Sequence, residues 1–199
     1  VTQHTRRFIR CFWALDTELA NARHYPSIHW LHSYSEYVED VGPWWKKETP
    51  DWIELRTEAL TLLQREERLQ QIVKLVGPDV LPDSQRLILF VAEIIKDGFL
   101  AQSAFEENDM YCTPERQVML LRTMMILYRR GKDLIELGVP LAQIRNLACV
   151  PRILRAKAEF GNDELDKLKE LEQNVMGETE TLAKEYAKEA SLICKPLST

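Results

Sequence analysis

An aromatic-rich stretch, residues 24–45, constrains the fold of this chain more than any other part of its sequence. Pro26 disfavours the helical backbone conformation for the residue before it, so the chain must turn at Tyr25. Large rings around such a turn bury much of their surface against neighbouring elements, which predicts a packed junction. The aromatic residues concerned are Tyr25, Trp30, Tyr34, Tyr37, Trp44 and Trp45, with Trp52 just beyond. We therefore expect the end of one fold before this stretch and a helical domain after it.

Residues 5–15, before the junction, have the pattern of a β-strand. The run is rich in β-branched and aromatic residues and is too short for a helix. Its large side chains are Phe8, Ile9, Phe12 and Trp13. Because almost no other strand signal follows, this strand has no obvious partner within the chain, and an unpaired apolar edge tends to find one. We expect it either to fold against the helical domain or to pair with a second copy, giving a homodimer through residues 5–15.

After the junction the sequence reads as a succession of helices. Ser33 or Ser35 is expected to cap a helix that ends before Gly42 and Pro43, since glycine and proline interrupt helices. Further apolar stripes predict long helices over residues 51–76, from residue 83, from residue 114 to about 138, and over residues 163–190. The predicted fold class is therefore all-α: a multi-helix, bundle-like domain preceded by one orphan β-strand.

Charge and cysteine usage exclude several classes of protein. The net charge is −5 and acidic and basic residues are interleaved, so no single-sign face is available for nucleic acid. The 4 cysteines lack metal-site or disulfide spacing and fit a reducing compartment. The sequence contains no run of 18 apolar residues, so we expect no direct membrane insertion. The first residue is Val, which leaves open that the chain is a piece of a longer protein.

Self-contained catalytic motifs are absent from the sequence. It has no GxxxxGK[ST] phosphate loop, GxGxxG, GxSxG or HExxH, and its 7 glycines provide few loops that could close around a phosphate. His24, His29 and His32, with nearby acids, could be imagined as metal ligands. Histidine at an aromatic junction is usually a packing or hydrogen-bonding residue, so we expect no metal site.

A second segment of interest, residues 98–111, links two predicted helices. Residue types alone favour an ordinary packed interhelix loop. The alternative is the wall of a pocket for a planar base, because Phe105 and Tyr111 offer flat apolar faces while Gln102, Ser103 and Asn108 offer directional polar groups. Both interpretations stay open on the residues themselves.

Four stretches of the sequence resemble the catalytic A (alpha) subunits of V-type and A-type rotary ATPases. In chain order they are FWALDTELANARHYPSIHWLHSYSEYV at 12–38, LLQREERLQQIVKLVGPDVLPDSQRLIL at 62–89, DGFLAQSAFEENDMYC at 97–112 and PERQVMLLRTMMILY at 114–128. The family carries its phosphate loop, catalytic glutamate and magnesium ligands in an upstream nucleotide-binding domain. The resemblance therefore implies that residues 1–24 are the tail of that domain, that residues 25–199 are the C-terminal helical domain, and that this chain holds no catalytic or metal-binding residue.

The resemblance also implies an adenine pocket. Tyr25 matches the aromatic residue that packs on the adenine ring in this family, and Phe105 matches the second aromatic of the pocket. Gln102, Ser103 and Ala104 would line the pocket, with Tyr111 at its far wall. ATP or ADP with magnesium is expected in the full-length subunit. Neither is expected to bind to this chain alone, which should be inactive as an ATPase.

The sharpest break in the helical pattern, residues 77–83, has a second implied role. It falls where the related F-type beta subunit has an acidic DELSEED loop that bears on the central shaft. Here the break has two prolines and fewer acids, and Asp83 is expected to cap the next helix. We expect Asp79, Val80 and Leu81 to be exposed if this loop contacts the rotor. The implied rotor-contact residues are Pro78, Asp79, Val80, Leu81, Pro82 and Asp83.

The resemblance finally implies partners and a location. The parent enzyme would couple ATP hydrolysis or synthesis to proton or sodium transport, and its partners would be the B subunits and the central-stalk subunits. Its place would be cytoplasmic, in the peripheral part of a membrane-bound complex. The alternative from a different class is a free-standing helical protein-interaction module with no nucleotide role.

Overall fold

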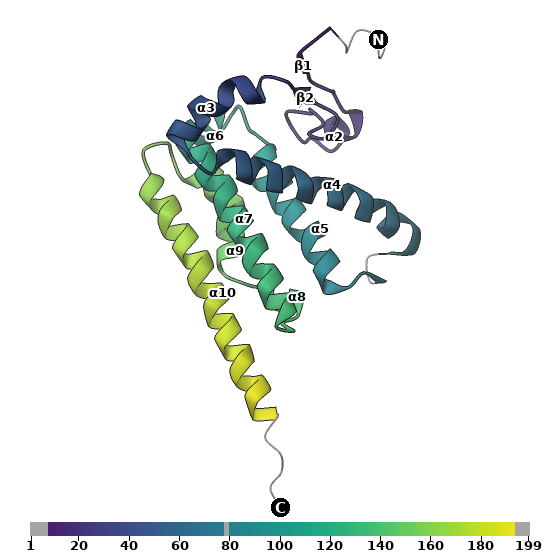
Figure 1. Ribbon diagram of the computed structural model, residues 1–199, viewed down its shortest axis with the longest axis vertical. Coiled ribbons are helices and arrows are strands. Elements are labelled where there is room, and N and C mark those ends of the chain that lie inside the picture. Colours follow the sequence, from purple (N-terminus) through teal and green to yellow (C-terminus); the bar gives the residue numbers. More distant parts are fainter. Residues whose placement is uncertain (1–7, 78–79, 194–199) are drawn as a thin grey trace, which may run out of the picture.

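The computed structural model describes residues 8–77 and 80–193. These residues are mostly helical and include a two-stranded sheet, which confirms the predicted all-α fold class (Figure 1). In chain order the elements are β1 (Cys11–Phe12), α2 (Thr17–Asn21), β2 (Tyr34–Ser35), α3 (Val38–Glu48), α4 (Trp52–Val76), α5 (Asp83–Ile95), the π-helix η2 (Lys96–Leu100), α6 (Glu107–Met110), α7 (Pro114–Glu136), α8 (Leu141–Arg145), α9 (Cys149–Glu159) and α10 (Leu165–Ile193).

The expected orphan strand has a partner within the chain, so that part of the prediction was wrong. β1 pairs antiparallel with β2, with Phe12 opposite Tyr34, and the two rings stack with centroids 6.0 Å apart. The Tyr34 hydroxyl also donates a hydrogen bond to the carbonyl of Ile9 at 3.0 Å. β2 is only two residues long, too short to give a periodic signal. The pairing supports the first of our two expectations, folding onto the same chain, while a homodimer through residues 5–15 stays a prediction.

The helix α3, which begins within the aromatic-rich junction, also differs from expectation. α3 runs through Gly42 and Pro43 instead of ending before them, and no serine side chain caps it. An interior proline removes one hydrogen bond of the helix and crowds the carbonyl four residues before it, so contacts outside the helix have to offset this cost. The Trp45 ring stacks on Trp52 with centroids 4.8 Å apart and an interplanar angle of 4°, which joins α3 to the start of α4. Tertiary packing therefore overrides the local preference.

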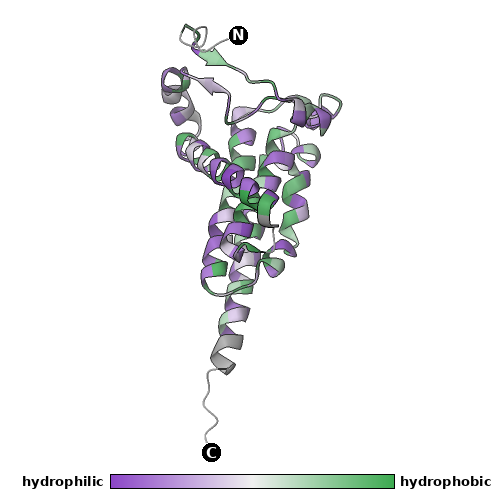
Figure 2. Ribbon diagram, turned by 90° about the vertical axis from the view of Figure 1, so that its right-hand side faces the viewer, coloured by the Kyte–Doolittle hydropathy of each residue, from purple (hydrophilic) through white to green (hydrophobic). Residues whose placement is uncertain are grey.

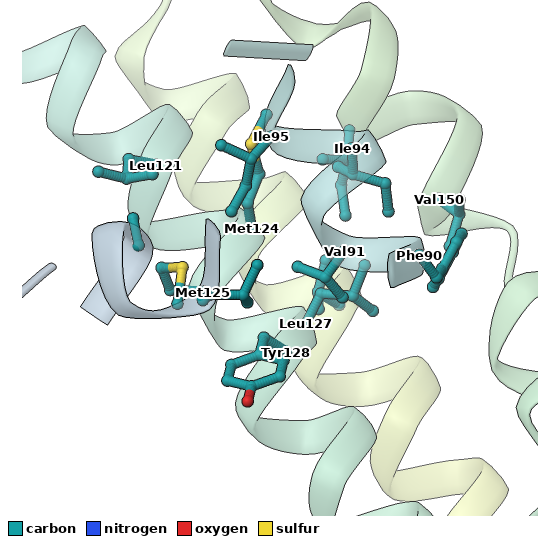
Figure 3. Packing of buried hydrophobic residues seen from close by; sticks show 14 of the residues in the cluster. Phe90, Val91, Ile94, Ile95, Leu121, Met124, Met125, Leu127, Tyr128 and Val150 are labelled. Atoms are coloured by element: carbon teal, nitrogen blue, oxygen red, sulfur yellow. The ribbon is translucent and has the colours of Figure 1, made fainter. Parts of the chain in front are cut away.

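The hydrophobic core is centred on α7. Its predicted stripe of Val118, Leu121, Met125 and Tyr128 is buried, each residue being at most 8% exposed. α5 packs along α7, and Figure 3 shows the apolar side chains of both helices meeting. Burying each such side chain contributes roughly 1.5–3 kcal/mol. Among the labelled residues, Phe90, Val91, Ile94 and Ile95 come from α5, and Leu121, Met124, Met125, Leu127 and Tyr128 from α7.

α10 packs along another face of α7, and its far end extends beyond the other helices (Figure 1). Charged residues dominate its sequence, yet Leu168, Leu171 and Val175 are fully buried against the core. Leu182 and Tyr186 continue the same seam as half-buried residues. The sparse apolar pattern of the sequence is thus sufficient for packing, because only one narrow stripe of this helix is covered.

An ion pair joins the start of α4 to α7. The two carboxylate oxygens of Asp51 accept hydrogen bonds from Nε and Nη2 of Arg122 at 2.6 and 2.7 Å. This two-pronged geometry is the strong form of a charge-assisted hydrogen bond. The hydrogen bond from Arg122 holds the pKa of Asp51 below its ordinary value of 3.8.

We expect this pair to make the protein sensitive to acid. Between the folded-state pKa of Asp51 and its ordinary value, the unfolded chain binds a proton that the folded chain lacks, so stability falls as the pH decreases. Asp51→Asn should be less stable than the original protein at about pH 7, and the difference should shrink at about pH 3. Urea unfolding at the two pH values measures this. The prediction would be contradicted if the difference in unfolding free energy between Asp51→Asn and the original protein were the same at both pH values.

Candidate functional site

Two distant segments meet at the turn that contains Tyr25. The amide of Gln102 donates a hydrogen bond to the carbonyl of Tyr25 at 2.6 Å, and Nε2 of His24 donates one to the carbonyl of Lys96 at 3.0 Å. The Tyr25–Pro26 peptide bond is cis. The structure therefore brings together the two segments that the sequence predicts to form one site.

The π-helix η2 directs the chain from α5 into this site. The amide of Ala101 donates to the carbonyl of Lys96 at 2.8 Å, which closes the wide turn. Gly98 lies at the contact with α7 and α9, since a Cβ atom there would stand 2.9 Å from the terminal methyl of Met124 and 3.6 Å from the Cα of Leu154. Single π-turns inside helices are frequent at functional sites because they redirect the backbone locally.

A buried polar network holds the loop that follows. The Asp109 carboxylate accepts the amide hydrogen of Ser103 at 2.7 Å, and Nζ of Lys157 lies 3.5 Å from the same carboxylate. Lys157 also donates to the carbonyl of Ala101. The side chains of Asp109 and Lys157 are only 8% and 15% exposed, so the pair acts in a largely water-free environment.

Arg116, at the start of α7, completes this network. It is fully buried, and its Nη1 donates to the carbonyl of Asn108 at 2.7 Å while its Nη2 donates to the carbonyl of Lys157. The Nε of Arg116 has no hydrogen-bond partner among the described residues. The roles of Asp109, Arg116 and Lys157 were not predicted from the sequence, because a charged residue in a loop or a first helical turn normally faces solvent.

The side chains predicted to hold adenine form an open surface. Phe105 is 99% exposed, Tyr111 is 71% exposed and Tyr25 is 53% exposed. Gln102 and Ala104 are exposed as well, and Ser103 is half-buried. Figure 2 shows that strand β1, near the end of the molecule where the chain begins, is also hydrophobic (green). The backbone of this surface is fixed by the network while its rings face outward.

The predicted rotor-contact segment is only partly exposed. Val80 is 68% exposed, as expected, and Pro82 is exposed. Leu81 is 7% exposed, so its expected exposure was wrong. Pro78 and Asp79 lie outside the described residues. Leu75, in the last turn of α4, is 85% exposed and adds an apolar side chain that the sequence pattern did not indicate.

Asp83 has a different role from the expected cap. It is the first residue of α5, and no side chain caps that helix. Its Oδ2 accepts the amide hydrogen of Leu141 at 2.9 Å, and its Oδ1 accepts a hydrogen bond from Arg86 at 3.3 Å. The carboxylate therefore binds the start of α8, two residues after the buried Leu81.

Two of the three junction histidines lie close to an acidic residue, and the hydrogen bonds of His29 bear on whether they could hold a metal. His29, His32 and Glu67 have ligating atoms within 4.8 Å of one another, while His24 bonds to Lys96 instead. The Nδ1 of His29 accepts hydrogen bonds from the amides of Leu31 and His32, so its Nε2 carries the proton. A metal-bound histidine has the reverse pattern, donating through one nitrogen and binding through the other. Burial and then His32 lower the pKa of His29, which favours its neutral form.

Comparison with known proteins gives a consistent result. The profile of the family described as the C-terminal domain of V and A type ATP synthase matches residues 42–145. The V-type ATP synthase alpha chain of Halothermothrix orenii is 51% identical over 172 residues, which is 86% of this chain and 29% of that protein. The A subunits of the A-type ATP synthases of Methanopyrus kandleri and Ignicoccus hospitalis are 45% and 44% identical over 186 residues, 93% and 92% of this chain and 31% of each relative.

The chain thus spans less than a third of the length of these curated relatives. The similarity covers both segments of the site, because the alignments include nearly all of the chain while the profile match contains the loop at residues 101–111. Within the described residues, no helix combines the length and the apolar character needed to cross a bilayer.

Removing Lys157 is expected to loosen the loop strongly. Lys157→Met would leave Asp109 as a buried, unpaired carboxylate and take away the donor to Ala101. Breaking a buried pair on one side costs roughly 3 kcal/mol of unfolding free energy. Lys167→Met is the matched control, because Lys167 forms an exposed pair with Glu164 and such pairs contribute about 0–1 kcal/mol. Equal losses in the two variants, measured by urea unfolding, would contradict a supporting role for the buried network.

Proposed function

The chain belongs to the family of the C-terminal domain of V- and A-type ATP synthases, in the catalytic A (alpha) subunit, and from this premise we propose two roles for it. It forms the adenine-binding part of a nucleotide site, and it contacts the central rotor of the complex. Together these roles couple ATP hydrolysis or synthesis to the transport of protons or sodium. The phosphates and magnesium are bound by other parts of the parent protein.

The observation that carries the adenine role is the backbone hydrogen bond between Gln102 and Tyr25. This bond joins Tyr25 to the loop that carries Phe105, although Tyr25 and Phe105 lie far apart in sequence. The rings of Tyr25 and Phe105 are the two that we propose to pack on adenine. The exposed rings provide flat apolar faces, and the exposed Gln102 side chain provides directional polar groups for the edge of a base. Ser103, Ala104 and Tyr111 complete the proposed lining. Stacking a base on an aromatic ring contributes roughly 1–3 kcal/mol, so this chain alone would bind ATP only at millimolar concentration or above.

The proposed division of the chain follows from this role. Residues 1–24 would complete the nucleotide-binding domain and residues 25–199 would form the helical domain, with the site at their border. The pairing of β1 with β2 crosses this border and ties the two parts together. The proposed partners are the B subunits and the central-stalk subunits, in the cytoplasmic, peripheral part of the membrane-bound complex.

Replacing Phe105 tests the adenine role. In the assembled ATPase, Phe105→Ala should raise the KM for ATP roughly 5- to 100-fold, as expected for the loss of one stacking partner, with a smaller change in kcat. Trp44→Ala is the matched control, because Trp44 is a half-exposed aromatic residue of α3 and is not one of the proposed lining residues. Steady-state kinetics measure both variants. An unaltered KM in Phe105→Ala would remove this residue from the nucleotide site.

The proposed rotor contact depends on the shape of the α4–α5 hairpin. α4 has 25 residues, which gives an arm roughly 37 Å long, and α5 returns from its end. Leu75 and Val80 are exposed near the tip and Leu81 anchors the segment to the domain. The contact we propose, through residues 78–83, therefore depends on apolar side chains and on prolines that limit backbone freedom, rather than on acidic residues.

A softened tip should uncouple transport from hydrolysis. We expect the replacement of Pro78, Val80 and Pro82 by glycine and serine to leave the KM for ATP intact while lowering the torque or the number of ions moved per ATP. Leu81 is kept, because its burial contributes to folding. Single-molecule rotation and transport by reconstituted complexes measure the effect. Wild-type coupling in this variant would assign the segment to packing alone.

A further inference from the structure

Lys96 stands at the point where the α4–α5 hairpin meets the turn that contains Tyr25. Its Nζ donates to Oε1 of Glu66, on α4, at 2.7 Å. Its carbonyl accepts hydrogen bonds from His24 at 3.0 Å and from Ala101 at 2.8 Å. One residue therefore binds an arm of the hairpin through its side chain and both segments of the nucleotide site through its backbone.

The ion pair between Lys96 and Glu66 is largely buried, and a buried ion pair adds little to the free energy of unfolding compared with an apolar pair. The Glu66 side chain is 5% exposed and that of Lys96 is 25% exposed. Taking two charges out of water costs about as much as their attraction returns, so an apolar pair of similar size would support folding equally well. A buried pair does, however, fix the relative position of the two elements that carry it, because its hydrogen bond is directional.

The two arms of the hairpin converge on this pair. Glu66 lies in the second half of α4, and α4 ends at Val76, where the tip of the hairpin begins. Lys96 directly follows α5, which begins on the other side of the tip at Asp83. If the tip were displaced, these helices would carry the displacement toward the pair and toward the turn that contains Tyr25.

Two hollows adjoin the pair. Their volumes are about 490 Å³ and about 250 Å³, and both are lined in part by Glu66 and Lys96. Gln70 lines both hollows and Glu18 lines the smaller one, so polar side chains share these linings with apolar residues such as Phe90 and Trp30. Close-packed interfaces resist small displacements, whereas an ion pair that borders two hollows has room to shift.

The contacts continue from Lys96 to the proposed adenine site. Its Nζ lies 5.3 Å from the centre of the Trp30 ring, and the centre of that ring lies 5.6 Å from the centre of the His24 ring. Nδ1 of His24 is buried without a hydrogen-bond partner among the described residues, so the bond to Lys96 is the polar contact that orients this ring. His24 adjoins Tyr25, whose carbonyl binds Gln102.

We propose that Lys96 and Glu66 are positioning residues, and that their ion pair transmits displacement of the α4–α5 hairpin to the turn of Tyr25 and the loop of Gln102. This inference rests on the proposed function, in which that turn and loop bind adenine and the hairpin tip contacts the rotor.

The test uses Lys96→Met and Glu66→Gln, singly and together, in the assembled ATPase. Methionine keeps an unbranched apolar side chain beside Trp30 and removes the charge. Each single variant should raise the KM for ATP roughly 2- to 30-fold, the range of changes along such networks, and lower the number of ions moved per ATP. The double variant should be no worse than the singles, because both remove one interaction. Lys96→Arg should restore most of the coupling.

Hydrogen exchange of the same complexes gives a second readout. In Lys96→Met, peptides that contain residues 100–106 should exchange faster, because the amides of Ala101 and Gln102 are bonded to the affected segments. Arg129→Met is the matched control. It breaks another ion pair of α4, in which Glu58 of α4 binds Arg129 of α7, and neither residue belongs to the proposed site. This control should leave the KM, the coupling and the exchange of residues 100–106 at wild-type values.

The outcomes separate this inference from the proposed function. A wild-type KM and coupling ratio in Lys96→Met, together with a raised KM in Phe105→Ala, would overturn the transmission alone and leave Lys96 a merely structural residue. A wild-type KM in both variants would overturn the adenine site and the transmission with it. Equal changes in Lys96→Met and Arg129→Met would overturn the transmission as well, because any loss of an α4 ion pair would then suffice.

Discussion

Burial of α7 is the constraint on which the rest of the structure depends. α4, α5, α9 and α10 all contact this helix, and its apolar residues reach every part of the core. A charged residue of α7 extends this role to its surface, where Arg122 binds Asp51 at the start of α4. Arg116, also on α7, supports the candidate site, because its guanidinium donates hydrogen bonds to the carbonyls of Asn108, in the loop, and Lys157, on α9. One helix thus positions both the hairpin and the proposed nucleotide surface.

Core and site are stabilised in different ways. Apolar packing between α5 and α7 is strong but non-directional, so it fixes which faces meet without fixing single atoms. The loop before α7 is held by Lys157, Asp109 and Arg116, whose donors and acceptors must match in direction as well as distance. Buried networks of this kind are costly when incomplete, and they specify one conformation when complete. Such a conformation suits a surface that has to present a ring before its ligand arrives.

The parts of this structure that the sequence predicts are those with long periodic patterns. The stripe of α7 and the seam of α10 follow from spacing alone, and the interruption after Val76 follows from its glycine and prolines. Three features depend on contacts between distant residues and escaped prediction. β2 is too short to show a period, Pro43 stays within α3 because the packing of Trp45 on Trp52 outweighs its local cost, and Leu81 is buried although it lies in a loop. The segments of the site were predicted through resemblance, whereas its supporting charges were not.

The pairing of β1 with β2 has a consequence for modularity. The proposed border between the two domains lies near residue 24, yet the sheet joins Cys11 and Phe12 to Tyr34 and Ser35 on the other side of it. An antiparallel bridge between Leu15 and Ile28 adds a further link, and Arg10 reaches across to Asp40 at 2.7 Å. A chimera that joins this helical region to the nucleotide-binding region of a relative would therefore separate natural strand partners if it were cut at residue 24. The smallest unit that can be exchanged without rebuilding contacts begins upstream of Arg10.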